Sequence, residues 1–257
     1  QRMLDGKVHW HDGSLIHALT PYVAQQRVYY YREVACEPVI PFAEEIVFED
    51  ELILVAYKPH FLPVMPGGKY VEECLQNRLR RKTGNQQLQA VHRIDNGTAG
   101  LVLFSVNPHS RQHYHGLFET HQVTKTYQAI ACINQRIPMD NQQWEIKNRL
   151  EKSEPRFLMR IVPGLANSHS RIRCLQHTAD KALFELKPIT GKTHQLRVHM
   201  QSLGWPLLND TYYPELQPSK PDDYSQPLQL LAQQLHFIDP VTQQVRHFSS
   251  HTQLSLD

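Results

Sequence analysis

A short apolar run, Ala99 to Phe104, follows directly on a charged and turn-forming segment, His92 to Thr98. Such a run, bounded by a turn, is typical of a strand buried inside a sheet. The turn Asn96-Gly97 places Asp95 on a loop at the mouth of that strand. Because charge is costly to bury unless it is paired or used, two interpretations of Asp95 stay open. Its carboxylate caps the turn, or it is a working side chain presented by rigid structure.

The composition is that of an ordinary globular protein. The chain has 257 residues, 40% of them hydrophobic and 20% charged, which is enough for a sizeable core in one large domain or two small ones. Its apolar runs are far shorter than the roughly 18 residues of a membrane span, so we expect no membrane partner. The four cysteines include no C-x-x-C pair, which argues against a zinc site or a disulfide framework and fits a reducing, cytoplasmic location.

The order of predicted strands and helices favours an α+β fold. Strands are expected at 46–48, 52–57, 101–105, 124–133 and 182–187, and helices at 71–82, 107–119 and 193–203, the first and last ending at Gly84 and Gly204. Weaker patterns predict a short helix at 15–25, a strand at 27–34 and a last helix–strand pair around 228–239. Without a strict βαβ rhythm, a mixed sheet flanked by helices fits best.

The sixteen histidines are candidate metal ligands. His109 and His113 are four apart on a predicted helix, a spacing that puts two ligands on one face. No glutamate follows His109, and no third ligand is evident, so a polar helix face is the better interpretation. His194 and His199 are five apart, which suits one metal poorly. The sequence also has no Walker, dinucleotide-binding or G-x-S-x-G motif.

Two further segments contain candidate partners for Asp95. Arg197 lies in the second turn of the helix predicted at 193–203, and arginine is a natural partner for a semi-buried carboxylate. Tyr127 lies near the start of the strand predicted at 124–133, where its ring could line the floor of a cleft. The alternatives are a surface ion pair for Arg197 and a core position for Tyr127.

Together these segments resemble a known family. "HRIDNGTAGL" resembles the H-R-L-D-x-x-T-S-G-L signature of the RluA-type pseudouridine synthases, "KTYQA" resembles their K-x-Y-x-A strand, and "GKTHQLRVHM" resembles their G-R-T-H-Q-I-R-V-H-L helix. Upstream, "FEDELILVAYKPHFLPVMPGG" resembles their opening E-D-x-x-x-x-V-x-x-K-P-x-G-x-x-x-H motif. The four motifs keep the family's order between about residues 45 and 210. Ala99 replaces the usual serine, and Asn96-Gly97 stands where a charged pair is more common.

The resemblance implies a fold and a reaction. The fold is a mixed, largely antiparallel curved sheet flanked by helices, with a catalytic cleft across the sheet. The enzyme isomerises uridine within RNA to pseudouridine: it breaks the N1–C1′ bond, turns the uracil and joins C5 to C1′. The stacked uridine must first be flipped into a pocket. Residues 45–257 would be the catalytic domain, and we interpret residues 1–44 as a short N-terminal extension, a remnant RNA-binding element.

The family pattern also assigns roles to residues. Asp95 is the catalytic carboxylate, which either attacks the ribose or assists proton loss to give a glycal-like intermediate. Arg197 pairs with Asp95, and Tyr127 stacks on the uracil and takes part in proton movement. Arg93 fills the gap left by the flipped base, and Leu196 packs against that base. The predicted substrate-binding set is completed by His92, Thr98 and Lys58, the last as a scaffold or cleft-edge residue.

The expected partner is RNA, with ribosomal RNA ahead of tRNA. No metal and no organic cofactor are expected, because the reaction is redox-neutral, and we expect a monomer. A basic cluster becomes a candidate phosphate-binding surface, although such clusters are also common on solvated helices; it consists of Arg78, Arg80, Arg81 and Lys82. The alternative functions are a non-catalytic RNA-binding or ribosome-assembly factor using the same cleft, and a hydrolase or metal-dependent nuclease built on the histidines.

Overall fold

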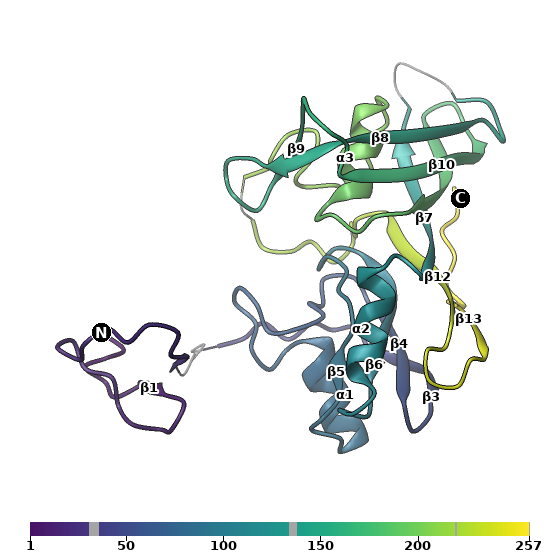
Figure 1. Ribbon diagram of the computed structural model, residues 1–257. Coiled ribbons are helices and arrows are strands. Elements are labelled where there is room, and N and C mark those ends of the chain that lie inside the picture. Colours follow the sequence, from purple (N-terminus) through teal and green to yellow (C-terminus); the bar gives the residue numbers. More distant parts are fainter. Residues whose placement is uncertain (31–35, 134–137, 219, 257) are drawn as a thin grey trace.

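The computed structural model describes residues 1–30, 36–133, 138–218 and 220–256. Figure 1 shows a main body built on one long sheet and, to one side of it, a small N-terminal unit. That unit holds a two-stranded antiparallel sheet of β1 (Val8–Trp10) and β2 (Val28–Tyr30). Among the described residues no helix is long and apolar enough to cross a membrane.

The main sheet is mixed and largely antiparallel. Its strands follow the order β3-β4-β6-β12-β7-β11-β10-β8-β9, with β13 beside β12 and β5 beside β6. The strand bounds are β3 Glu45–Glu49, β4 Ile53–Lys58, β5 Gln89–Ala90, β6 Ala99–Ser105, β7 Thr124–Cys132, β8 Gln143–Lys152, β9 Met159–Val162, β10 Ser168–His177, β11 Lys181–Pro188, β12 Leu230–Ile238 and β13 Val245–Ser249. The predicted α+β class is confirmed.

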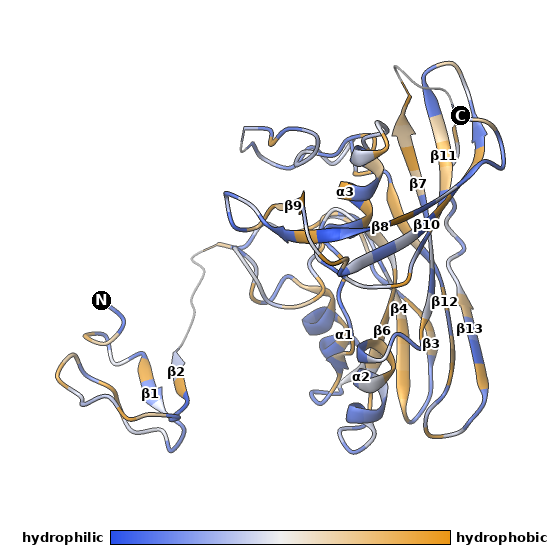
Figure 2. Ribbon diagram, turned by 45° about the horizontal axis from the view of Figure 1, so that its top comes forward, coloured by the Kyte–Doolittle hydropathy of each residue, from blue (hydrophilic) through white to orange (hydrophobic). Residues whose placement is uncertain are grey.

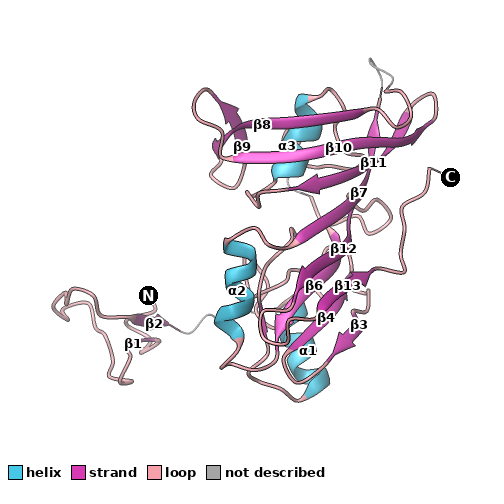
Figure 3. Cartoon of the chain, turned by 45° about the vertical axis from the view of Figure 1, so that its right-hand side comes forward, coloured by secondary structure: helices cyan, strands magenta, loops and turns pink. Residues whose placement is uncertain are grey.

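In the part of the chain that the structure describes, three short helices cover this sheet. They are α1 (Leu75–Thr83), α2 (Arg111–Glu119) and α3 (Gln195–Ser202). Figure 3 shows α1 and α2 beside the half of the sheet that contains β3, β4 and β6, and α3 against the half that contains β8, β10 and β11. Hydrophobic residues concentrate on the central strands (Figure 2), because these strands are covered on both faces.

Local signals explain most of these elements. Every residue of β6 is buried, as the apolar run predicts. α1 buries Leu75 and Leu79 and ends at Gly84, whose φ of 73° is the left-handed conformation that glycine adopts readily. α1 begins four residues later than expected, because the Glu37 carboxylate accepts the backbone N–H groups of residues 71–73. α2 begins at Arg111, after a turn over residues 108–110, instead of at residue 107.

Two predicted helices are wrong. Residues 15–25 form turns and a single β-bridge, with the backbone N–H of His17 bonded to the Thr20 hydroxyl. Residues 230–238 form β12, near the middle of the sheet. A bulge between Ala232 and Gln234 breaks the two-residue alternation of that strand and so produces a helix-like spacing of apolar residues. The strands β8, β9 and β10 had no counterpart among the predicted elements.

The two halves of the sheet meet where β6 runs parallel to β12. Only two residue pairs make this contact, Ala99 with Leu231 and Gly100 with Ala232. Gly100 has a φ of 116°, and a Cβ there would overlap the backbone of Ala232. A glycine is therefore required for β6 and β12 to approach each other. The loop that carries Asp95 leads directly into this junction.

We expect Gly100→Ala to lower the free energy of unfolding by at least about 2 kcal/mol, because the new side chain combines an unfavourable φ with a backbone clash. The matched control is Gly116→Ala within α2, where nothing lies within 4 Å of the new Cβ. That variant should be unchanged or more stable by up to about 1 kcal/mol. Urea unfolding followed by circular dichroism measures both, and equal stability of the two variants would contradict the role of Gly100.

Candidate active site

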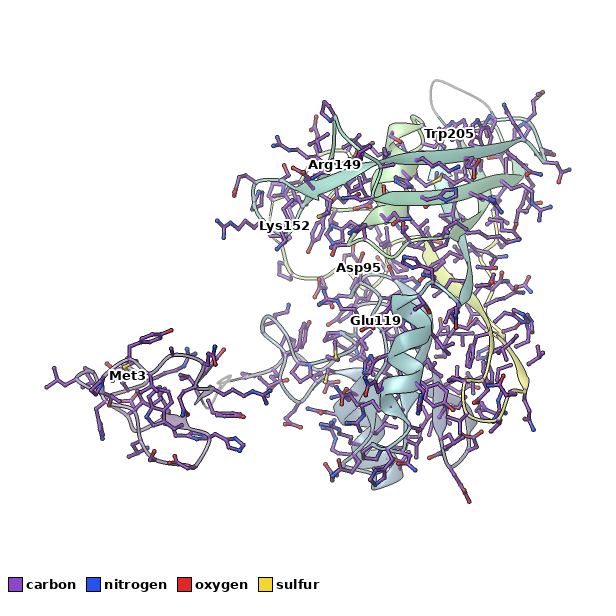
Figure 4. All side chains as sticks on the ribbon, viewed as in Figure 1. Met3, Asp95, Glu119, Arg149, Lys152 and Trp205 are labelled. Atoms are coloured by element: carbon purple, nitrogen blue, oxygen red, sulfur yellow. The ribbon has the colours of Figure 1, made fainter. Side chains whose placement is uncertain are left out.

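The three motifs that follow residue 90 converge on one cavity of about 520 Å³. Its walls come from both halves of the sheet: the loop 92–98, the end of α2 and the start of β7, then the loop 188–194 and the first turn of α3. Figure 4 shows Asp95 and Glu119 where the two halves of the molecule face each other. Asp95, Tyr127 and Arg197 all line this cavity, as predicted.

The Asp95 loop is fixed through its backbone. Lys58 donates to the carbonyl of Asn96 at 3.0 Å, and His60 Nδ1 donates to the carbonyl of Gly97 at 2.6 Å. The Asp95 carboxylate accepts no backbone N–H from the described residues; its hydrogen bond comes from Arg197 Nη1 at 3.3 Å. The capping interpretation is therefore wrong, and the carboxylate stays 23% exposed toward the cavity.

Arg197 is held by a second carboxylate, that of Asp210. Its Nε and Nη2 donate to the two Asp210 oxygens at 2.8 and 2.6 Å, a bidentate pair that fixes the guanidinium plane. The ring of Tyr212 lies 4.6 Å from the Arg197 guanidinium carbon. Burial alone would lower the pKa of Arg197, but the hydrogen bonds to Asp210 and the charge of Asp95 raise it. Arg197 is thus a permanent cation.

Asp210 was absent from the predicted site. Its side chain is 1% exposed, and Oδ1 also accepts the backbone N–H groups of Tyr212 and Tyr213. This loop residue has no periodicity or motif partner of its own in the sequence. The only signal was physical: a buried arginine needs more than one partly exposed carboxylate to satisfy it.

Tyr127 lies on β7 with its side chain half-buried in the cavity wall. Burial, with the nearby charge of Asp95, raises the pKa of Tyr127. Its hydroxyl is therefore protonated near neutral pH and can donate a hydrogen bond. Leu196 and Leu230 are buried and supply apolar wall to the same cavity, which matches the predicted base-packing position of Leu196.

Lys58 is a scaffold residue. Its ammonium is fully buried and donates to the carbonyls of Pro59, Leu62 and Asn96 at 2.7–3.0 Å. Burial lowers the pKa of Lys58 to about 7, while the charge of Asp95 opposes that shift. Of the two roles considered for Lys58, the contacts favour the scaffold over the cleft edge.

The remaining predicted substrate-binding residues differ in character. His92 accepts the backbone N–H of Leu103 on Nε2 and stacks on Phe118 at 4.3 Å. Burial lowers the pKa of His92 to about 3, so the ring is neutral and carries its proton on Nδ1. Thr98 is 2% exposed at the start of β6. Arg93 is exposed at the rim of the cavity and has no ion pair with the described residues.

The basic cluster of α1 is divided between two environments. Arg78 is 13% exposed, pairs with Glu44 and Glu73, and donates to the carbonyls of Ile40 and Phe42. These contacts tie α1 to the segment before β3, so Arg78 is structural and we remove it from the predicted phosphate-binding surface. A side chain with all its donors engaged is poorly suited to a phosphate.

The other three cations of the cluster are more accessible. Arg80 is half-buried and donates to the carbonyl of Leu88. Arg81 and Lys82 are about half-exposed and contact Glu72 and Glu44 respectively. Exposed pairs of this kind contribute little to stability, so both side chains can exchange their partners.

The histidine pairs do not form a metal site in the described residues. His109 lies before α2 begins, so it does not share a helix face with His113. His199 is buried inside α3, with Nε2 near Ser168 and Asn148. A separate group at the far end of β10 brings ligating atoms within 4.8 Å of one another; its members are Asp140, Cys174 and His177.

Comparison with known proteins agrees with this geometry. The family described as RNA pseudouridylate synthase matches residues 52–202, more than half of the chain. An uncharacterized RNA pseudouridine synthase of Synechocystis is 30% identical over 79% of this chain and 69% of its own length. The dual-specificity RNA pseudouridine synthase RluA of Vibrio cholerae is 31% identical over 76% and 78% of the two chains.

Coverage of the relatives varies. The ribosomal large subunit pseudouridine synthase C of Vibrio cholerae is 30% identical over 65% of this chain, which spans 52% of that protein's length. Among solved structures, human RNA pseudouridylate synthase domain containing 1 superposes with a TM-score of 0.66, covering 84% of this chain and 86% of that one at 22% identity, and so shares the fold. The family match and the relatives together show that this chain belongs to the RNA pseudouridylate synthase family, as an enzyme of the RluA type.

Proposed function

We propose that this protein isomerises specific uridines of structured RNA to pseudouridine, with Asp95 as the catalytic carboxylate. The single observation that carries the proposal is the state of that carboxylate. It lines a cavity and accepts no backbone N–H from the described residues. It is held by Arg197, whose Nε and Nη2 donate to Asp210, and His194 Nε2 lies 3.8 Å from it. A carboxylate with free lone pairs beside a cavity is available for chemistry.

The reaction requires a flipped uridine. A cavity of about 520 Å³ has room for one nucleotide, and the unstacking cost of a few kcal/mol is offset by contacts inside it. Leu196 and Leu230 line this space with apolar surface, which keeps water away from a reactive ribose. Tyr127, with its proton retained, lies where it can stack on or donate to the uracil.

The chemistry conserves every atom. The N1–C1′ bond breaks with its electron pair on the uracil, the uracil turns, and C5 bonds to C1′ before C5 gives its proton to a base and N1 gains one. Asp95 either bonds to the ribose at C1′ or removes a ribose proton to give a glycal-like intermediate; the geometry suits both routes. Arg197 fixes the direction of the carboxylate in either case.

For the substrate we propose ribosomal RNA ahead of tRNA, acted on by a monomer that needs neither metal nor organic cofactor. The relatives include enzymes named for the ribosomal large subunit and enzymes named for tRNA, so this order is a prediction that RNA mapping tests. The described cysteines are unpaired, as a reducing, cytoplasmic compartment requires. A non-catalytic RNA-binding factor is the second candidate, because a cavity that holds a base could serve binding alone.

We expect Asp95→Asn to reduce pseudouridine formation at least about a thousandfold, because the amide can neither attack the ribose nor accept its proton. The matched control is Asp222→Asn, an exposed acid paired with Lys69 outside the cavity, which should retain full activity. Carbodiimide-based mapping on total RNA from cells with and without the gene identifies the substrate, and the purified proteins are then compared on it. Product from the Asp95→Asn variant at the wild-type rate would refute the role of Asp95, and no product from wild type would favour the binding-only alternative.

We expect Asp210→Asn to lower kcat about 10- to 100-fold with little change in KM, because Asp210 orients Arg197 without contacting the cavity. Steady-state kinetics on the mapped RNA separate the two constants. Asp210→Glu keeps the charge and should recover part of kcat. A rise in KM at constant kcat would instead mean that Asp210 serves RNA binding.

We expect replacing both Arg81 and Lys82 by Gln to reduce the slope of log affinity against log salt by about one to two, because each phosphate contact releases a counterion. RNA affinity measured across a salt series gives the slope. The control is Lys147→Gln, an exposed cation of β8 paired with Glu145, which should leave the slope unchanged. An unaltered slope in the double variant would remove α1 from the RNA interface.

A further inference from the structure

Lys125 is the second residue of β7 and lies two positions before Tyr127. Alternate residues of a strand project from the same face, and both side chains line the cavity. Lys125 is half-buried, and its Nζ lies near Gly191, where an added Cβ would be 3.9 Å away. The loop at Gly191 therefore lies beside the ammonium group, and the lack of a side chain on this glycine keeps the loop from covering Nζ more closely.

This ammonium group has no counter-ion and no hydrogen-bond acceptor among the described residues. The other two buried cations of the site are satisfied: Lys58 by three carbonyls, Arg197 by two carboxylates. Burial lowers the pKa of Lys125. The charge of Lys125 also helps to keep the neighbouring His92 ring neutral, so this ring supplies no negative charge to Lys125. A partly desolvated cation without a partner costs free energy that an incoming anion would recover.

The position of Lys125 indicates which anion fits. Lys125 lines the same cavity as Asp95, Arg197 and Leu196. Its charge acts on His92, whose ring stacks on Phe118 at the end of α2, so Lys125 lies on the α2 side of the cavity. Glu119 and His121 also line the cavity and are exposed, so the cavity opens to solvent beside the end of α2. A flipped nucleotide buries its base and leaves its flanking phosphates at the entrance. Exposed Arg93 lies at the same rim.

We propose that Lys125 binds a backbone phosphate adjacent to the flipped uridine and thereby makes the site selective for uridine within a polynucleotide. The inference rests on the proposed function and adds to it a subsite for a phosphodiester. A lysine ammonium acts as a compact point charge, which suits a phosphate whose orientation varies between RNA substrates. The subsite anchors the strand, while Asp95 and Tyr127 address the nucleoside.

We expect Lys125→Met to weaken RNA binding about 10- to 100-fold, to leave kcat within about threefold of wild type, and to reduce the salt slope by about one. The probe is a short RNA hairpin containing the mapped uridine, with affinity measured by fluorescence anisotropy and kcat at saturating RNA. The control is Lys181→Met, at the opposite end of the β7–β11 pair and outside the cavity. It should match wild type in all three quantities.

A second arm locates the phosphate. Hairpins carrying one neutral methylphosphonate at successive positions around the uridine should bind wild type weakly at one flanking position, and Lys125→Met should show no further loss there. Additive losses at every position, or a drop in kcat with unchanged affinity, would overturn the subsite. This arm measures binding alone. It can therefore use any uridine-containing hairpin that the wild-type protein binds, and it still tests the subsite when the wild-type protein forms no pseudouridine and no uridine has been mapped. Failure of the subsite is thereby distinguished from failure of the proposed function.

Discussion

The Arg197 guanidinium, shared between two carboxylates, is the interaction on which the site depends. Asp210 takes two of its donors at 2.6 and 2.8 Å, and Asp95 takes one at 3.3 Å. The pair with Asp210 is buried and bidentate, so its attraction offsets the free energy lost when the guanidinium is removed from water. The contact with Asp95 is a single, longer hydrogen bond. It orients the Asp95 carboxylate and leaves its other lone pairs free. Arg197 thus holds the loop that contains Asp210 and orients the Asp95 carboxylate for reaction.

This arrangement requires both halves of the sheet. Asp95 lies just before β6, in the half that contains β4 and β6. Arg197 belongs to α3, which lies on the half that contains β10 and β11 (Figure 3). The halves meet at the short parallel contact of β6 with β12, where only Gly100 allows the backbones to approach. The loop and the junction are adjacent in sequence, so the position of the carboxylate is set by the most constrained point of the fold.

Motif residues and buried strands could be predicted from the sequence because their signals are local. β6 is continuous apolar sequence, and α1 ends at a glycine. Part of β12 was mistaken for a helix because its bulge gives a helix-like spacing of apolar residues. Asp210 was missed because it lies in a loop without periodicity, 13 residues after its partner Arg197 in α3. Arg78 was assigned to a surface because its acceptors belong to a distant segment. The last two errors share one cause: a side-chain contact with another segment of the chain leaves no periodic pattern in the sequence.

Three cations of the site illustrate how burial and pairing separate roles. Lys58 donates hydrogen bonds to three backbone carbonyls, and breaking the one to Asn96 would loosen the Asp95 loop. Its role is therefore structural. Arg197 is neutralised by carboxylates and acts through one of them. Lys125 is partly desolvated and has neither kind of partner among the residues that the structure describes, and a protein that retains such a charge has gained no stability from it in the free state. An RNA phosphate that pairs with Lys125 offsets this desolvation cost, so binding of the strand is coupled to filling of the cavity.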